Sequence, residues 1–342
     1  MHIAIDAMGG DHGPSVIVPG ALAGARRHNV SLLLVGKKSE VDAALAAQDT
    51  TGVDVEVVDA SQTIDMEDHP AQAVRRKTDS SINIALRLVK EGRAQAMMSA
   101  GNSGAVMAAS LMILGRIKGI DRPAIASGIP NAKSSFSLLL DMGAVTDPKP
   151  INVVQSAVMG QLYAQTVMGI DNPTIGLISN GEEASKGNAL VQQVYPMLQA
   201  MEGLNFAGNV EGRDIAAGAV DVFVTDGFTG NVILKTAEGV AAMLVDLLRK
   251  EITATLSRKL AALVLRPAFK ALGAKLDYAA IGGAPLLGVN GAVIISHGRS
   301  NERAIENAVG ACARAVEHDL AGGFARRVSA THAAAAEAPA AE

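Results

Sequence analysis

Tryptophan is absent from this 342-residue chain, and the aromatic residues together make up only 3% of it. The core must therefore be aliphatic, and the 49% content of hydrophobic residues supplies ample material for it. So few aromatic rings argue against a surface that stacks on nucleic-acid bases. The 30 Lys and Arg residues are outnumbered by 34 Asp and Glu residues, so the net charge is −4. The chain has no overall basic field to attract nucleic acid, and we expect no nucleic-acid partner.

Cysteine is nearly absent as well, since Cys312 is the only one in the chain. A single cysteine excludes an intrachain disulfide framework and a zinc site built from several cysteines, and it fits a reducing, cytosolic setting. Cys312 lies within GACARAV, a helical stretch of small apolar residues, so we expect a core residue rather than a nucleophile. The 7 histidines show no metal-ligand spacing. We therefore expect no metal.

Long hydrophobic runs are missing too. The longest, near residues 105–114, is shorter than the roughly 20 residues that a membrane span requires. The chain opens directly into HIAID, without the charged and then apolar pattern of a signal peptide. The mean hydropathy of +0.25 is nevertheless high for a cytosolic protein. We expect a cytoplasmic protein that can still contact a membrane surface.

Short apolar runs alternate with segments of helical periodicity along most of the chain. The runs that predict strands are 2–6, 31–35, 53–58, 94–99, 123–129, 135–140, 173–178, 220–225 and 291–296. The segments that predict helices are 15–28, 40–46, 82–91, 104–114, 151–168, 188–200, 232–250 and 301–320. Strands that alternate with helices of about ten or more residues predict an α/β fold with a largely parallel sheet, and runs this apolar predict strands covered on both faces.

Two segments depart from this alternation. Residues 246–278 form a long helical region with no strand beside it, which predicts a helical pair projecting from the body, kinked or interrupted at Pro267. Residues 330–342 are a low-complexity, alanine-rich stretch that we expect to be disordered. No linker divides the rest, so we expect one α/β domain over residues 1–329.

Ligands of α/β sheets bind at the carboxyl ends of the strands, so the loops after the strands are the first candidates for a site. After strand 2–6 comes DAMGGDHGP, where three glycines within five residues allow a close backbone approach and an anion-binding nest. After strand 94–99 comes SAGNSGA, where Asn102 or Ser103 can cap a helix whose N-terminus offers an anion site. Ordinary turns and caps would use the same residues. The candidate binding residues of these loops are Asp6, Gly9, Gly10, Asp11, His12, Gly101, Asn102, Ser103 and Gly104.

Three further loops carry polar or charged side chains. In SNGEEASKGN, Lys186 lies before a helix beside Asn180 and Glu182 and can hold a phosphate by charge. A cluster of solvated surface charges would give the same sequence pattern. In TDGFTGN, a glycine-rich turn again joins a strand to a helix, and Asn231 and Lys235 share a helical face. The candidate binding residues of this turn are Asp226, Gly227 and Gly230. His297 follows the last strand at the same end of the sheet, though a lone histidine is usually structural.

Several of these phrases together carry a specific resemblance. They are DAMGGDHGP, SAGNSGA, GNVEGRD, DGFTGN, LKTAEG, and GGAPLLGVNG with the ISHG that follows. In this order they resemble the PlsX family, the phosphate acyltransferases of bacterial phospholipid synthesis, over residues 1 to about 320. One departure is Val145, which stands after Ala144 where the family commonly has asparagine.

The resemblance implies a fold like those of isocitrate and isopropylmalate dehydrogenases and phosphotransacetylase, in three αβα layers, and a homodimer without a metal or nicotinamide cofactor. It also implies reversible transfer of a fatty acyl group from acyl carrier protein to inorganic phosphate. The acyl phosphate then feeds a membrane glycerol-3-phosphate acyltransferase. Because phosphate is itself the nucleophile, the enzyme must hold an anion and stabilise an oxyanion. Lys186, Asn231 and His297 are the catalytic candidates for this work.

Other functions remain open at this point. A short-chain phosphotransacetylase that uses acyl-coenzyme A is the alternative enzyme. An NAD-dependent decarboxylating dehydrogenase would need a dinucleotide-binding loop and an acidic metal cluster, and the sequence has neither. A non-enzymatic membrane scaffold is the fourth possibility.

The helical pair predicted at residues 246–278, which we call the arm, also suggests a membrane contact. Between Ile252 and Leu276 it carries five cations and no acid, although the chain as a whole is net negative. This combination is typical of an interfacial helix that anionic lipid attracts. The membrane-contact candidates are Leu260, Leu263, Val264 and Phe269. The same leucines could instead form a dimer interface.

Overall fold

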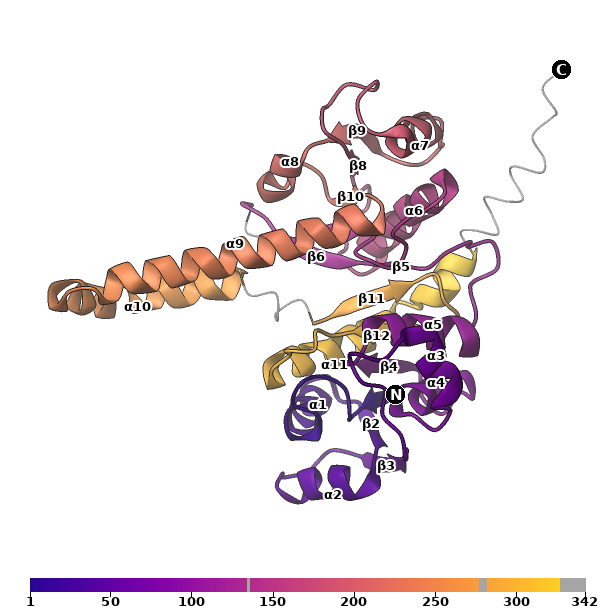
Figure 1. Cartoon of the computed structure of the whole chain (residues 1–342), viewed down its shortest axis with the longest axis vertical. Helices are drawn as coiled ribbons and strands as arrows, with labels where there is room; N and C mark the ends of the chain where they lie inside the picture. Colours follow the sequence, from indigo (N-terminus) through magenta and orange to yellow (C-terminus); the bar gives the residue numbers. More distant parts are fainter. Residues whose placement is uncertain (134–135, 277–281, 327–342) are drawn as a thin grey trace.

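The computed structural model describes residues 1–133, 136–276 and 282–326 (Figure 1). The predicted tail 330–342 and the last residues of the predicted arm lie outside this part of the chain. Within it, the strands form two sheets, and most strand pairs are parallel, as expected.

The larger sheet has 7 strands in the order β3-β2-β1-β4-β12-β11-β5. Its strands are β1 (His2–Asp6), β2 (Ser31–Gly36), β3 (Val55–Asp59), β4 (Ala96–Ser99), β5 (Ala124–Ile125), β11 (Ala284–Leu287) and β12 (Ala292–Ile295). The strands from β3 to β12 are parallel, and β11 runs antiparallel to both of its neighbours. The carboxyl ends of β1, β4 and β12 therefore meet at one edge.

The smaller sheet has 5 strands in the order β6-β7-β10-β8-β9. Its strands are β6 (Ser127–Pro130), β7 (Phe136–Leu140), β8 (Ile175–Ile178), β9 (Phe206–Val210) and β10 (Val222–Val224). Only β6 is antiparallel to its neighbour. The loops after β7, β8 and β10 therefore lie along one edge of this sheet.

Helices cover both faces of each sheet, which confirms the three-layer αβα prediction. On the larger sheet, α1 (Pro14–His28), α2 (Lys38–Ala46) and α11 (Glu302–Glu317) cover one face, and α3 (Pro70–Arg76), α4 (Ser81–Lys90) and α5 (Ser103–Ile113) cover the other. Side chains alternate along β1, so Ile3 and Ile5 pack with α1 and α11, while Ala4 packs with α4 and α5. Cys312 of α11 is fully buried in the first of these layers, as predicted for a core residue.

The smaller sheet is built in the same way. One face is covered by α6 (Pro150–Thr166) and α7 (Ala189–Gln199), and the other by α8 (Gly212–Ala217) and α9 (Gly227–Thr253). Several of its features were not predicted, among them the short helix α8. Segment 123–129 splits into β5 and β6, which belong to different sheets. Strand β9 was missed because Gly208 and Asn209 interrupt its apolar pattern, and in the larger sheet β11 was missed because Pro285 lies within it.

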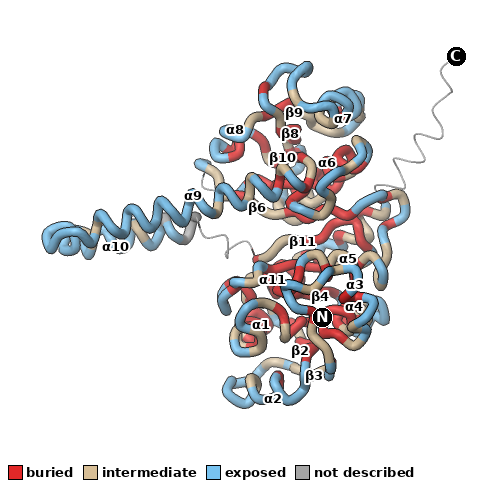
Figure 2. The backbone as a smooth tube through the Cα atoms, viewed as in Figure 1, coloured by how far each residue is buried: buried red, intermediate tan, exposed pale blue. Residues whose placement is uncertain are grey.

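Helix α9 continues far beyond the body and pairs with α10 (Leu256–Leu276), so the predicted projecting helical pair is confirmed (Figure 1). The chain reverses at residues 254–255, and α10 continues through Pro267 without interruption. Nearly all of this arm is exposed (Figure 2).

Candidate functional site

The loops after β1 and β4 touch each other through glycines. A side chain at Gly9 would place its Cβ 2.7 Å from the backbone nitrogen of Gly101. Gly10 has a φ of 78° and lies against the carbonyl oxygen of Gly298, which also accepts a hydrogen bond of 2.8 Å from the backbone of Asp11. Glycine is required at these places, because larger residues would separate the loops. The structure therefore brings Gly9, Gly10 and Gly101 together with the His297 loop.

Asp6 lies beneath these loops and is 1% exposed. Its Oδ2 accepts a 2.6 Å hydrogen bond from Oγ of Ser99, and the same Oγ accepts one of 3.0 Å from the backbone of Gly101. Burial raises the pKa of the Asp6 carboxyl, and the hydrogen bonds from its neighbours offset part of this effect. Asp6 thus ties the end of β1 to the loop after β4, below the surface that a ligand would reach.

Asn102 caps α5, which settles the choice between Asn102 and Ser103 that the sequence left open. Its Oδ1 accepts a hydrogen bond from the backbone of Ala105, and its Nδ2 donates to the carbonyl oxygens of three residues of the loop before α3. These three residues are Asp65, Met66 and Asp68. Gly104 allows the same close approach, since a Cβ there would lie 2.8 Å from Cγ of Pro70. Asn102 and Gly104 therefore hold a neighbouring loop, while Ser103 and His12 lie nearby without a side-chain hydrogen bond to another described residue.

The start of α9 forms the second part of the site. Asp226 caps the helix by accepting a hydrogen bond of 2.8 Å from the backbone of Thr229. Gly227 and Gly230 face the loop that follows β7, and a Cβ at Gly230 would lie 1.9 Å from the carbonyl oxygen of Asp141. The exposed Asn231 lies next in the helix, beside Gly143 of that loop.

Asp141 organises this loop from its centre. It is 4% exposed and accepts hydrogen bonds from the backbone amides of Ile125, Ala144 and Val145, at 3.0, 3.0 and 2.7 Å. Burial raises the pKa of its carboxyl, and the backbone hydrogen bonds partly counteract that. The carboxyl group thereby fixes the loop that faces Asn231.

One contact joins the two parts of the site. Nζ of Lys235, on α9, lies 3.2 Å from Nε2 of His297, which follows β12 of the other sheet. Lys235 is also paired with Glu238 one turn further along, at 2.9 Å. Lys235 and His297 are both exposed, so this junction is open to a ligand.

The protonation of His297 follows from its surroundings. Nδ1 of the ring lies 3.1 Å from the backbone nitrogen of Arg299 and accepts its hydrogen bond, so the proton of a neutral ring is on Nε2. Burial and the charge of Lys235 lower the pKa of His297, which keeps the ring neutral near pH 7. Nε2–H and the ammonium group of Lys235 are then two donors facing each other, an arrangement that an oxygen of an anion would satisfy.

The loop after β8 lies along the same edge of the smaller sheet. Oδ1 of Asn180 accepts a hydrogen bond of 2.8 Å from the backbone of Gly187, and Glu182 pairs with Arg213 at 3.2 Å. Lys186 is exposed. Among the described residues, no hydrogen bond or ion pair connects this loop to Lys235 or His297.

The sequence analysis missed three contributors. Ser99 was read as part of a loop, yet its hydroxyl links Asp6 to Gly101. Lys235 was noted only for sharing a face with Asn231. Asp141 could have been found by its position, since an acid directly after the apolar run SFSLLL lies at the carboxyl end of a strand.

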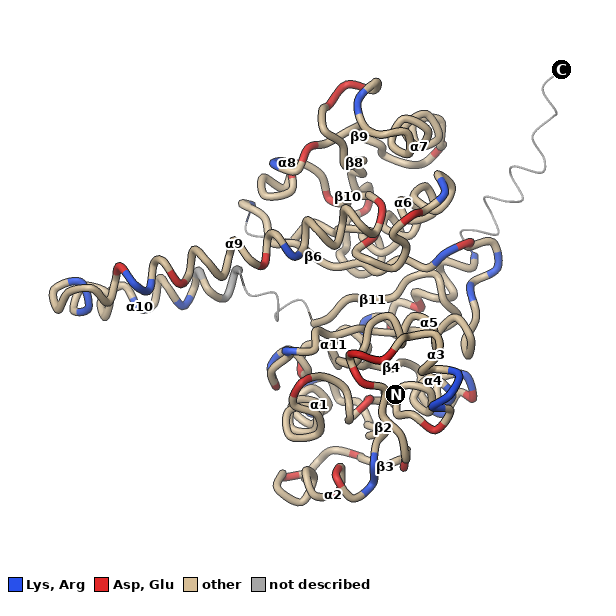
Figure 3. The backbone as a smooth tube through the Cα atoms, viewed as in Figure 1, with Lys and Arg blue, Asp and Glu red and all other residues tan. Residues whose placement is uncertain are grey.

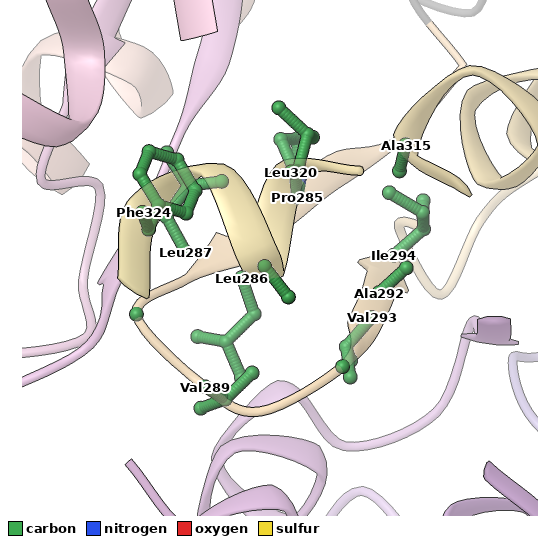
Figure 4. A pocket seen from close by; sticks show the side chains of 13 residues that line it. Pro285, Leu286, Leu287, Val289, Ala292, Val293, Ile294, Ala315, Leu320 and Phe324 are labelled. Atoms are coloured by element: carbon green, nitrogen blue, oxygen red, sulfur yellow. The ribbon is translucent and has the colours of Figure 1, made fainter. Parts of the chain in front are cut away.

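An apolar pocket lies away from these groups, between β11, β12 and the segment that follows α11 (Figure 4). Leu286, Ile294 and Phe324 are among its lining residues. Its volume is about 10 Å³, which is at most the space that one water molecule needs. It is therefore a gap in the packing rather than a ligand site.

Comparison with known proteins decides the family. Residues 1–322 match the family model described as "Fatty acid synthesis protein". The chain belongs to this family. The phosphate acyltransferase of Desulfitobacterium hafniense is 52% identical over 318 residues, which cover 93% of this chain and 94% of that protein. The phosphate acyltransferase of Geobacter sulfurreducens is 49% identical over 309 residues, 90% of this chain and 89% of that protein. The resemblance expected from the motifs is thus confirmed.

Solved structures support the fold of this family member. A phosphotransacetylase from Streptococcus pyogenes superposes with a TM-score of 0.63 at 19% identity and covers 93% of this chain and 94% of its own. A 4-hydroxythreonine-4-phosphate dehydrogenase from Klebsiella pneumoniae gives a TM-score of 0.51 at 13% identity, over 95% of this chain and 99% of its own. These similarities confirm the predicted α/β fold shared by phosphotransacetylases and dehydrogenases.

Proposed function

We propose that this phosphate acyltransferase transfers a fatty acyl group from acyl carrier protein to inorganic phosphate, and that its acyl phosphate feeds a membrane glycerol-3-phosphate acyltransferase. The observation that carries the proposal is the pair of facing donors on Lys235 and His297, set between two sheets in a member of this family. A phosphate oxygen placed beside this pair, within hydrogen-bond distance of both Nζ and Nε2, would accept from both. The attacking oxygen would then be held where the two parts of the site meet.

Asn231 fits the oxyanion role in this scheme. It lies one helical turn before Lys235, on the same face of α9, and its amide can donate to the oxygen that becomes negative when phosphate attacks the thioester. The thioester carbon forms a bond to the phosphate oxygen, and the bond to sulfur then breaks to release the thiolate. The proton that hydrogen phosphate loses balances the one that the thiolate takes up, and Nε2–H of the neutral His297 ring can donate a hydrogen bond to the departing sulfur. Lys186, at the edge of the same sheet, supplies a further cation for the phosphate.

A covalent acyl-enzyme is not part of this mechanism. Cys312 is completely buried, and burial raises the pKa of its thiol far above the neutral range, so it does not form a thiolate. Phosphate itself is the nucleophile.

The test is an assay of purified protein with palmitoyl-acyl carrier protein and inorganic phosphate. We expect phosphate-dependent release of free thiol and formation of acyl phosphate, and little release from acetyl-coenzyme A. Equal or faster turnover of acetyl-coenzyme A would favour a short-chain phosphotransacetylase instead. No thiol release with either donor would refute the proposed function.

The arm fits a second copy of the chain and a lipid surface. Apolar side chains on both of its helices are exposed, among them Leu244, Leu248, Leu260, Leu263 and Val264. So much exposed apolar surface on a hairpin of two helices needs a partner. We therefore propose a homodimer in which two arms pack against each other.

A dimer of arms would leave the tip, by which we mean the chain reversal at residues 254–255 and the outer half of α10, free to face outward. Val264 is 80% exposed and Leu263 is 65% exposed, while Phe269 is half-buried. Lys and Arg positions lie along α10 and near the tip (Figure 3). Exposed apolar groups beside cations suit the boundary of an anionic bilayer, so we propose that the tip binds the membrane peripherally. None of the helices in the described part is long and apolar enough to cross a membrane.

A further inference from the structure

A second pocket, which is polar, lies outside the groups described above. Its volume is about 510 Å³. It lies between the end of α5, the loop before β5, the loop after β7 and the start of α6. Lys and Arg gather at this edge of the molecule in Figure 3. The residues that line it are Leu111, Arg116, Asp121, Arg122, Val145, Asp147, Lys149 and Asn152.

The wall of this pocket contains a buried donor without a partner. Asn152 is 7% exposed, and its Oδ1 accepts a 2.9 Å hydrogen bond from the backbone of Lys149 at the start of α6. Its Nδ2 is buried and makes no hydrogen bond. A buried donor left unpaired costs free energy, so such groups in folded proteins usually have a partner that completes them. Asn152 lines the pocket, so an acceptor that enters the wall from the pocket would pair with this amide.

The charges around Asn152 define the kind of acceptor. Three cations line the pocket, and none of them forms an ion pair with another residue in the described ranges. Arg116 donates to the carbonyl oxygen of Asp121, which holds its side chain, and Arg122 and Lys149 have no side-chain partner there. With Asp121 and Asp147 the lining has a formal charge of +1, from three cations and two acids. The N-terminus of the 17-residue α6 adds positive potential.

We propose that this pocket binds a phosphate group of a substrate. A tetrahedral anion can accept from the amide of Asn152 and from the guanidinium of Arg122 at the same time. Because the proposed mechanism holds inorganic phosphate at Lys235 and His297, the group that fits this pocket is the phosphodiester of the phosphopantetheine arm that carries the acyl group, and inorganic phosphate is the other source that the test separates. The inference rests on the proposed function for this choice of sources.

The pocket lies close to the helix that carries the catalytic candidate Asn231. Val145 lines the pocket, and its carbonyl oxygen accepts a hydrogen bond of 2.9 Å from the backbone of Gly227 at the start of α9. A smaller neighbouring pocket is lined by Arg122 and Asn152 as well as by Asp141 and Gly227. The loop that contains Asp141 thus lies between the proposed phosphate site and Asn231. A long arm anchored by its phosphate in the pocket would pass along this loop toward Asn231.

The test uses three variants of the full-length protein. Arg122→Ala removes a cation, and Asn152→Asp replaces the free amide by a carboxylate oxygen while the other oxygen still accepts from Lys149. Arg93→Ala is the control, because Arg93 pairs with Glu56 of β3 at the opposite edge of the larger sheet. We expect the KM for one substrate to rise about tenfold or more in the first two variants, with little change in kcat or in melting temperature. The control should behave like the wild type.

The two sources give different results. A rise in KM for acyl-acyl carrier protein alone identifies the phosphodiester, and a rise in KM for phosphate alone identifies inorganic phosphate. Unchanged KM values for both substrates in Arg122→Ala and Asn152→Asp would overturn the proposal.

Calorimetry separates this inference from the proposed function. Titration with 4′-phosphopantetheine and with inorganic phosphate measures binding without turnover. Binding of either compound that is weakened in both pocket variants, and not in Arg93→Ala, supports the pocket even if the wild type turns over no acyl carrier protein. Binding that is absent in the wild type, or equal in all variants, overturns it.

Discussion

Lys235 and His297 face each other across the two sheets, with Nζ and Nε2 3.2 Å apart. Lys235 comes from the third turn of α9, and His297 from the loop after β12. Each side chain is fixed by its own neighbours, Glu238 for the lysine and the backbone of Arg299 for the histidine. The candidate site therefore draws residues from both sheets. A substitution of Lys235 or His297 would alter the surroundings of the other side chain.

The titration of His297 should depend on α9. Burial lowers its pKa below the ordinary value of 6.5, and the charge of Lys235 lowers it further, whereas Glu238 raises it. Lys235→Met should therefore raise the midpoint, and Glu238→Gln should lower it. NMR of the ring carbons as a function of pH measures both. Because the folded pKa is depressed, the contribution of His297 to stability is lost as pH falls from 6.5 through the folded pKa. A midpoint that Lys235→Met leaves unchanged would contradict the contact.

Asn231→Ala and Lys186→Ala should each reduce turnover by roughly 10²-fold or more if they remove stabilisation of the transition state. The fold should remain intact, because both side chains are exposed. Lys90→Ala is a suitable control, since Lys90 is an exposed lysine at the far end of α4. Steady-state kinetics with the long-chain donor measures the effect, and near-normal turnover in both variants would remove them from the site.

Two glycines of α9 make a matched pair. A Cβ at Gly230 would lie 1.9 Å from the carbonyl oxygen of Asp141, whereas Gly239 has open space around it. Gly230→Ala should push α9 away from the Asp141 loop, which lowers both the melting temperature and the activity. Gly239→Ala should stabilise the helix by about 1 kcal/mol. Thermal unfolding of both proteins tests this, and equal stabilities would argue against the tight packing at Gly230.

Cys312→Ser should retain activity. Its thiol is buried between α11 and the sheet, and its sulfur lies 3.6 Å from the carbonyl oxygen of Met97, which a serine hydroxyl can also reach. Only a modest loss of stability is expected. Mass spectrometry after incubation with the acyl donor provides a second check, because an acyl group trapped on Cys312 would rule out direct attack by phosphate.

The arm should bind anionic vesicles through its tip. Leu263→Glu and Val264→Glu place carboxylates among the exposed apolar groups and should abolish co-sedimentation with phosphatidylglycerol liposomes. Met197→Glu, at a partly exposed position on α7, is the control. Analytical ultracentrifugation shows whether the dimer persists. If the wild type does not sediment with the liposomes, or if the tip variants still do, the arm serves only as an interface between subunits.

The sequence predicted the parts of this molecule that depend on local pattern. Apolar runs placed most strands, and the rule that ligands bind at the carboxyl ends of parallel strands led to Asp6 and His297. Asn102 and Ser103 were both recognisable as candidate helix caps from residue type and position, and the structure selects Asn102.

The rest depends on contacts between distant segments. The role of Asp141 is set by amides of Ile125, Ala144 and Val145, and no local pattern reveals that these converge. Strand β11 contains a proline and is recognisable only by its two antiparallel neighbours. The contact of Lys235 with His297 likewise joins residues 62 positions apart in the chain. The ends of the strands that carry the candidate site could be predicted from the sequence, but the way the two sheets bring those ends together could not.

Helix α9 has 27 residues, so it is about 40 Å long at 1.5 Å per residue. Its first three turns carry Asn231 and Lys235, and its last turns belong to the arm. The helix therefore connects the candidate site directly to the arm. A tilt of about 5° at its start would move the far end by roughly 3 Å over that length. A partner that held the tip of the arm would thus also influence the spacing between Lys235 and His297.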